Sequence, residues 1–440
     1  MRQYFTGLRF ISRNARIAFA LFMLPIFLSA CAGGGYQTQS WDQRPAQQTP
    51  GDIASPVPGV EPGRPVSTGT ADFASAPDPQ GLPPVKVAIL LPLSGPQAGI
   101  GQSMLSAAQL AVFEIGHSTF QLMPKDTKGT AAGAQAAARE ALRDGSRLVL
   151  GPLFAHSVRS ARNVTQSANV PMIAFSTDWT LANSRTFLIG FLPFDQISRI
   201  VSYASAQGSS RIGMLSPADR YGDGVISAYK AISMKNSQLT PARIERFAPQ
   251  GNDLSSVVRR FSDYDKRKAM GDKFGAPFDA VLMPVGGAMA RSVGSFLSHY
   301  DMPPAQVRRL GTGLMDDPAL AADPSLNGTW FAAPSPGARR SFEHRYKSTF
   351  FEKPPRIASL AYDATALAAI LARSGLEKTG RPAFDPASIA NPNGFAGVDG
   401  IFRFRPDGIV ERGLAVLAFK NGRVVVIDEA PKTFQVRRTH

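Results

Sequence analysis

The sequence predicts an α/β protein with two doubly wound lobes. From Val85 onward, continuous apolar stretches alternate with longer stretches of helical periodicity. Such apolar stretches are typical of strands in a parallel sheet that is covered on both faces. The alternation restarts after residue 194, and the 440 residues are enough for two packed lobes and a tail.

The first lobe begins with the stretch VKVAILL, a buried strand. We expect strands at 85–91, 120–124, 147–152 and 170–176. Helices are expected between them at 102–115, 133–145 and 156–169. Gly145 is the expected end of the second helix.

The second block repeats this rhythm. Expected strands are 211–217, 242–248, 278–284, 308–314 and 328–333. Expected helices are 222–232, 252–268 and 287–300, followed by two more near 338–350 and 357–373. The last segment is rich in strands, and Arg405–Gly408 and Asn421–Gly422 are turn signals within it.

The N-terminus has the pattern of a signal peptide over residues 1–30. Basic residues precede an apolar stretch, Ile17–Leu28, that is too short to span a bilayer comfortably. The sequence Leu28-Ser-Ala-Cys31 resembles the bacterial lipobox, in which the cysteine thiol is diacylated. Cys31 is the only cysteine, so no internal disulfide is expected, and we predict lipidation there. The alternative is a plain secretory signal with an incidental cysteine.

Ala32 follows the cysteine. By resemblance to sorted lipoproteins, this residue favours anchoring in the inner leaflet of the outer membrane, facing the periplasm. Residues 31–84 are rich in Pro, Gly, Gln, Ser and Thr and lack apolar periodicity. They predict a disordered tether.

The net charge of +15 favours anionic neighbours such as cell-wall polymers or lipid head groups. Basic residues are not interleaved with aromatic ones in any run, so we expect no nucleic-acid partner.

Catalytic motifs are absent from the sequence. The glycines at 95, 99 and 101 would need a fourth at position 104 for a dinucleotide fingerprint, but position 104 is Met, and no lysine completes a phosphate loop. G-x-S-x-G and H-E-x-x-H do not occur, and the five histidines lack metal-ligand spacing. We therefore expect no enzyme activity, no metal and no cofactor.

Four stretches, in order, resemble the leucine/isoleucine/valine-binding protein family of type I periplasmic binding proteins. They are the stretches beginning VKVAILLPLSGP, LVLGPLFAHSV, RIGMLSPADRYGDG and GNDLSSVVRRF. The resemblance implies two lobes joined by three hinge crossovers, near Phe191–Asp195, Ala332–Pro336 and 375–390. It assigns 85–194 and 334–380 to lobe 1, 195–333 and 381–430 to lobe 2, and 431–440 to a flexible tail.

Ligands of this fold bind where the carboxyl ends of the strands meet. The candidate ligand-binding residues are therefore Ser94, Gly95, Ser157, Ser176, Thr177, Asp178, Tyr221 and Asp316. For Ser94, Ser176 and Thr177, helix capping or turn formation is an equal alternative. Tyr221 could instead pack its ring between the lobes.

Departures from the family pattern affect its amino-acid site. The resemblance places Ala155 at the family's serine and Asp178 at its threonine, the two positions that hold a ligand carboxylate. It places Ala288 and Gly313 at the tyrosine and the acid, which hold the ammonium, so Asp316 would have to replace the acid. A buried aspartate repels a carboxylate, and Asp178 suits an amine, a sugar hydroxyl or a neutral amide.

The chain also resembles lipid-anchored activators of penicillin-binding proteins, at Leu90–Gly95 and Val149–Leu153. One hypothesis is a non-catalytic regulator of peptidoglycan synthesis, with a penicillin-binding protein as partner. The alternative is the substrate-binding component of an ABC importer for branched-chain amino acids or amides, with an ABC permease as partner. Both hypotheses allow a small polar ligand, and both place the protein at a membrane through its acyl chains.

Overall fold

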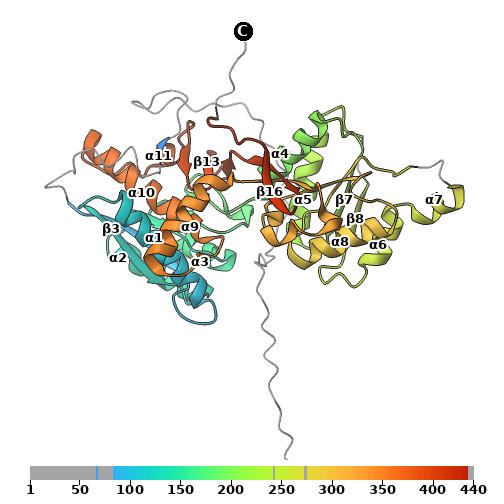
Figure 1. Ribbon diagram of the computed structural model, residues 1–440. Coiled ribbons are helices and arrows are strands. Elements are labelled where there is room, and N and C mark those ends of the chain that lie inside the picture. The colour runs from blue at the N-terminus through green and yellow to red at the C-terminus, as the bar shows by residue number, and fades with distance from the viewer. Residues whose placement is uncertain (1–65, 68–82, 241–242, 272–274, 435–440) are drawn as a thin grey trace, which may run out of the picture. The chain divides into compact units, whose positions relative to one another are not determined.

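The computed structural model describes residues 66–67, 83–240, 243–271 and 275–434. The predicted signal peptide, Cys31 and most of the predicted tether lie outside the described residues. Two sheets, each covered by helices, confirm the predicted two-lobed α/β architecture (Figure 1). Among the described helices, none is both long and apolar enough to cross a bilayer.

The first lobe has a five-stranded parallel sheet in the order β3-β2-β4-β5-β6. Its strands are β2 (Val85–Leu91), β3 (Phe120–Asp126), β4 (Leu148–Leu150), β5 (Met172–Ala174) and β6 (Thr186–Leu188). Alternate side chains of β2 enter different cores, because successive residues of a strand point to opposite faces. Val87, Ile89 and Leu91 pack in one core and Ala88 and Leu90 in the other.

Five helices cover this sheet. α2 (Ala131–Arg143) and α3 (Ala155–Ser167) contribute to the core that holds Ala88. α1 (Ala98–Ile115), α9 (Pro336–Phe350) and α10 (Ala358–Thr379) contribute to the other. Figure 1 shows α9 beside α1, although more than two hundred residues separate them in the chain.

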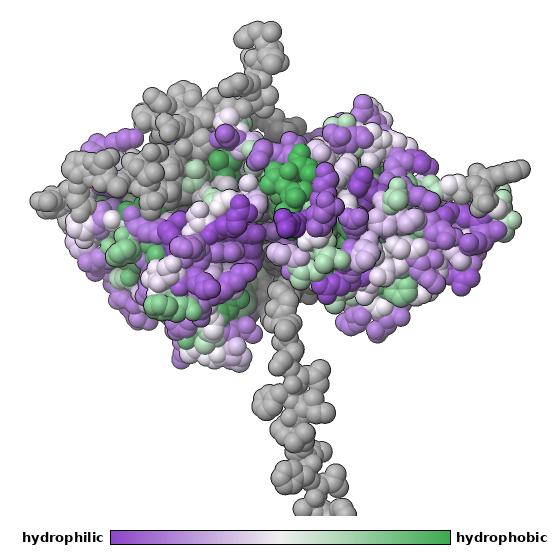
Figure 2. Space-filling view, viewed as in Figure 1, coloured by the Kyte–Doolittle hydropathy of each residue, from purple (hydrophilic) through white to green (hydrophobic). Residues whose placement is uncertain are grey.

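The second lobe has a seven-stranded sheet in the order β16-β15-β11-β10-β9-β7-β8. Five of its strands are parallel: β7 (Ile212–Pro217), β8 (Ile244–Phe247), β9 (Ala280–Leu282), β10 (Arg308–Gly311) and β11 (Trp330–Ala333). The hairpin of β15 (Ala415–Lys420) and β16 (Arg423–Asp428) adds to β11 in antiparallel orientation. β16 is an edge strand, and its valines form an apolar patch in Figure 2.

Helices cover both faces of this second sheet as well. α4 (Pro193–Ala206) and α5 (Arg220–Ser233) pack on one face, and α6 (Leu254–Phe261) and α8 (Gly287–His299) on the other. The single helix expected at 252–268 was wrong. Asp263 adopts the left-handed conformation, with φ of 51°, and separates α6 from α7 (Tyr264–Met270).

A small third sheet joins β1 (Val66–Ser67), β12 (Phe395–Gly397), β13 (Gly400–Phe404) and β14 (Val410–Arg412), and the short helix α11 (Pro386–Ile389) precedes it. β1 lies within the predicted tether and pairs with β12. Phe395 and Phe402 belong to the core of the first lobe, whereas the expected division placed them in the second. The third crossover therefore follows Arg412, at residues 413–414, and not at 375–390. The other two crossovers lie where they were expected, between β6 and α4 and between β11 and α9.

Arg412 connects two of the crossovers. Its backbone N–H donates to Asp195 Oδ2 at 2.9 Å, and its Nη2 donates to the carbonyl of Ile189 at 2.5 Å. The guanidinium carbon lies 4.9 Å from the ring centre of Phe191. Asp195, Ile189 and Phe191 all flank the first crossover, so Arg412 ties the start of the third crossover to the first.

Close packing of β7 gives a stability prediction. A Cβ at Gly213 would lie 2.7 Å from the rings of Phe261 and Phe278, whereas a Cβ at the exposed helical Gly99 meets nothing within 4 Å. We expect Gly213→Ala to destabilise the second lobe by about 1–3 kcal/mol through overpacking. The control Gly99→Ala should be neutral or stabilise by about 0.5–1 kcal/mol. Urea denaturation measures both, and equal midpoints for the two variants would contradict the packing described here.

The Asp195 carboxyl gives a pH prediction. The residue keeps some exposed surface, but protein surrounds its carboxyl, and this desolvation raises the pKa to about 7. Between about pH 4 and 7 the folded state therefore keeps a proton that the unfolded state releases, and stability falls as pH rises through that range. Asn at this position keeps an oxygen acceptor for Arg412 and does not titrate. We expect the wild type to lose stability relative to Asp195→Asn between pH 4 and 8, by a few kcal/mol at about 1.4 kcal/mol per tenfold change in proton affinity.

The measurement is a set of thermal melts of both proteins across that pH range. Subtracting the variant's curve removes the contributions of the other carboxyl groups. A difference that is constant with pH would show that Asp195 is ionised in the folded state throughout.

Candidate functional site

The loop after β2 is closed by its own hydrogen bonds. The Ser94 hydroxyl donates to Asp126 Oδ2 at 2.5 Å, and the backbone N–H groups of Leu93 and Lys128 donate to Oδ1. Partial burial would raise the pKa of Asp126, but these bonds outweigh it and hold the pKa below its usual range. Gly95 is exposed with φ of 80°. In this structure Ser94 therefore serves the turn, as the capping alternative anticipated.

The other first-lobe candidates follow β4 and β5. Ser157 is fully buried in the first turn of α3, and its hydroxyl donates to the carbonyl of Thr130 at 3.3 Å. Ser176 accepts a hydrogen bond from the backbone N–H of Asp178, and Thr177 between them is half-buried. These serines again have local structural roles.

Asp178 is the charged candidate of this lobe. Asp178 is only 2% exposed. Its Oδ1 accepts hydrogen bonds from the backbone N–H and the hydroxyl of Thr180, and so caps the 3-10 helix η1 (Trp179–Leu181). Its Oδ2 has no hydrogen-bond partner in the described structure, and Arg159 Nη2 lies 3.6 Å away. One carboxylate oxygen is thus buried without a hydrogen bond, beside the Arg159 guanidinium.

The structure brings the Asp178 segment against the Tyr221 segment of the second lobe. The indole of Trp179 lies against Gly224 in the first part of α5, where an added Cβ would be 2.7 Å from the ring. Tyr221 lies one turn earlier on this helix, and its hydroxyl donates to Thr312 Oγ1 at 2.9 Å. Residues from both lobes therefore meet here, as the resemblance implied.

Asp316 is already paired. Its side chain is 5% exposed, and both oxygens receive hydrogen bonds from Arg339 in the first turns of α9, one of them from Nη2 at 3.3 Å. Asp316 follows β10 in the second lobe, whereas α9 packs in the core of the first through Phe342 and Tyr346. The acid proposed as a ligand contact therefore joins the lobes.

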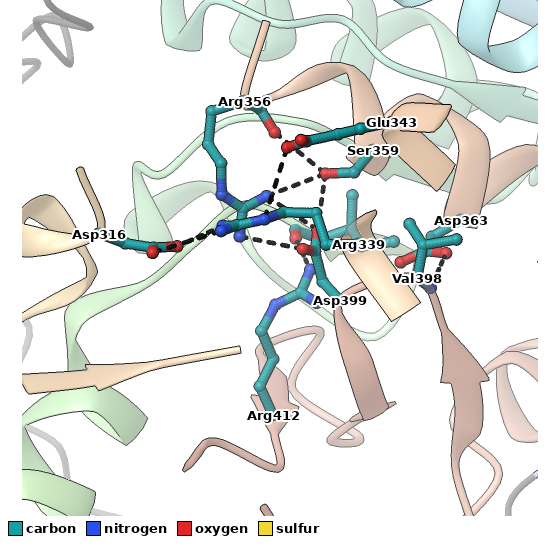
Figure 3. Close-up of polar contacts among 10 residues, drawn as sticks. Asp316, Arg339, Glu343, Arg356, Ser359, Asp363, Val398, Asp399 and Arg412 are labelled. Carbon is teal, nitrogen blue, oxygen red and sulfur yellow. Dashed lines mark hydrogen bonds and ion pairs between the residues drawn. The ribbon is translucent and has the colours of Figure 1, made fainter. Parts of the chain in front are cut away.

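Behind this pair lies a buried cluster of charges, drawn in Figure 3. Asp399 is fully buried and pairs with both ends of the Arg356 guanidinium, at 2.9 and 3.1 Å, and with the Ser359 hydroxyl at 2.6 Å. Burial alone would raise the pKa of Asp399, but Arg356 and Arg412 hold it below its usual range. Burial, with the charge of Asp399, raises the pKa of the fully buried Asp363.

The position that the resemblance gives to the family's acid leaves little room for a side chain. The backbone N–H of Gly313 donates to Gln196 Oε1 at 2.7 Å, and an added Cβ would lie 3.2 Å from that oxygen. Ala155, at the serine position, is 2% exposed and begins α3. Neither position therefore carries the hydroxyl or the acid that the resemblance assigns to it.

Sequence reasoning missed four residues of this region: Trp179, Gln196, Arg339 and Arg412. Trp179 directly follows the candidate residue Asp178, so its place in the sequence could have identified it. The other three come from distant parts of the chain, and no local pattern marks them. Among the described residues, no three or more His, Cys, Asp or Glu side chains gather where they could hold a metal ion.

Comparisons with known proteins agree with this fold. The family model described as "Periplasmic binding protein" matches residues 84–423. Leu/Ile/Val-binding protein BraC3 of Rhizobium johnstonii is 23% identical over 310 residues, which cover 67% of this chain and 80% of that protein. An uncharacterized protein of Rickettsia prowazekii is 22% identical over 191 residues, which cover 41% of this chain and only about half, 51%, of that relative.

Solved structures show the same fold at low identity. A putative branched-chain amino acid ABC transporter from Rhodospirillum rubrum has a TM-score of 0.67 and 17% identity, covering 78% of this chain and 100% of that one. The substrate-binding protein LivJ from Streptococcus pneumoniae, solved with isoleucine, has a TM-score of 0.53 and 19% identity, covering 79% and 100%. Because the family model spans most of the chain and both lobes have the matching topology, the chain belongs to the periplasmic binding protein family.

Proposed function

We propose that this chain is a non-catalytic, lipid-anchored protein of the periplasm that regulates peptidoglycan synthesis by contacting a penicillin-binding protein. It would be held at the inner leaflet of the outer membrane through acyl chains on Cys31. Residues 31–84 would then act as a tether for the binding-protein domain.

The observation that carries this proposal is which charged groups a free amino acid would meet at the family's ligand site. Asp178 stands where the resemblance expects a hydroxyl for the ligand carboxylate, and its buried charge repels that group. Asp316, the remaining acid for the ligand ammonium, already binds Arg339. A free amino acid would therefore meet repulsion at one end and no open partner at the other.

The second candidate is the substrate-binding component of an ABC importer. The names of BraC3 and LivJ, which bind or are solved with branched-chain amino acids, favour this candidate. Under it, Asp178 Oδ2 would receive an amine or amide donor of the ligand. This function would require an ABC permease as partner.

A ligand panel separates the two candidates. We expect leucine, isoleucine, valine and their amides to leave the melting temperature of the full-length chain unchanged within about 1 °C. A ligand at one hundred times its Kd would add about 2.7 kcal/mol and raise the melting temperature by roughly 3–4 °C. Differential scanning fluorimetry measures the shift, and isothermal titration calorimetry confirms it.

The matched variant Ala155→Ser/Asp178→Thr returns both hydroxyls of the family pattern. It should melt like the wild type and show a larger shift with leucine, since the repelling charge is gone. Crosslinked envelopes should yield a penicillin-binding protein with the wild type. Recovery of a permease instead, together with a leucine shift of the wild type, would replace this proposal by the importer.

A further inference from the structure

We propose that this chain holds its two lobes together without a ligand, through two contacts of its own: the Arg339–Asp316 ion pair and the packing of Trp179 on Gly224. The inference goes beyond the proposed function, because it does not depend on which partner or ligand the chain has.

The ion pair joins parts that belong to different cores. Asp316 follows Met315, which is fully buried in the second lobe, and Arg339 precedes Phe342, which is buried in the first. The two side chains are only 5% and 14% exposed, and Glu343 lies 3.6 Å from the same guanidinium. Loss of Arg339 would leave the Asp316 carboxylate buried without its cation, which is strongly unfavourable, and loss of Asp316 would leave Arg339 only the more distant Glu343. The pair is thus a lobe-to-lobe link with little access for water.

Trp179 makes the second link. Its ring packs against the first-lobe core, and its edge meets Phe194 of α4 with centroids 5.0 Å apart at 74°. The same indole lies on α5 at Gly224, where any larger residue would collide with it. Asp178 fixes the start of η1 through Thr180, so the indole is held in place on its own lobe. An aromatic side chain of one lobe therefore fills a position that only glycine leaves open on the other.

Because of these contacts, the chain itself supplies the interactions that a ligand supplies in other hinged binding proteins. In a hinged binding protein, a ligand shifts the population toward the closed form through contacts that it makes only there. Here the guanidinium of Arg339 supplies the cation to the second-lobe carboxylate, and Trp179 supplies the apolar contact. Both groups are covalently part of the chain, so the joined state requires no bound molecule.

The test is hydroxyl-radical footprinting of the ligand-free full-length chain in detergent micelles, read by mass spectrometry at Trp179. Trp330 is an internal reference, since it packs within the second lobe against Arg308 and Tyr203. We expect Asp316→Asn and Arg339→Gln each to raise the modification rate of Trp179 about threefold, with Trp330 unchanged. The near-isosteric Asn variant covers the case in which Arg339→Gln does not fold.

The matched control is Arg340→Gln, an exposed arginine on the same helix, which should leave Trp179 at the wild-type rate. Gly224→Ala must displace the Trp179 indole, so its Trp179 modification rate is the reference for a lost contact with α5. The charge-swapped double variant Asp316→Arg/Arg339→Asp should return Trp179 toward the wild-type rate. Two results would overturn the proposal: a wild-type rate equal to that of Gly224→Ala, or an unchanged rate in folded Asp316→Asn.

Discussion

The structure depends on placing several charges in a region from which water is largely excluded. Three crossovers must pass between two lobes within a small volume, and Arg412 lies where the first and third of them meet. Its guanidinium lies over Phe191, as does that of Arg356 from the loop before α10, at 4.2 Å. The buried carboxylate of Asp399 balances these cations, because an unpaired buried charge is strongly unfavourable. The position of the crossovers therefore follows from charge compensation as well as from chain connectivity.

Pairing of buried charges within the protein also explains how the side chains of the candidate site are arranged. In this fold a second-lobe acid is useful to a ligand only if it lacks a partner within the protein. Asp316 pairs with Arg339, and Gln196 crowds the Gly313 position, so the second-lobe acid forms its contacts within the protein. In the first lobe, Asp178 Oδ2 is buried without a hydrogen bond, 3.6 Å from Arg159. Asp316, which the family resemblance offered as a ligand contact, thus joins the two lobes in this structure.

The proposed regulatory role is consistent with such an arrangement. A transport protein must open and close around its cargo, and its lobes need a small energy difference between the two states. A protein that presents a fixed surface to a partner, as proposed for this chain, needs the opposite, and the contacts between the lobes would favour one arrangement. The family membership and the altered residues are therefore compatible, because a fold fixes architecture while its site decides function.

The sequence alone determined the α/β class, the two-lobed order and most strands. Strands such as Val85–Leu91 are buried on both faces, and their continuous apolar runs are local signals. It also pointed to the segments after β5 and at the start of α5, which meet in the structure, because loops at the carboxyl ends of parallel strands converge. Local patterns failed at Asp263, where a left-handed residue divides a helix, and at β12 and β14, which are too short to show a period. Only the tertiary structure decided that Phe395–Arg412 packs with the first lobe, that Arg339 occupies Asp316 and that Trp179 lies on Gly224. Each of these joins residues at least 23 positions apart, and pairing at such distances depends on packing between elements, which no periodicity of a single segment encodes.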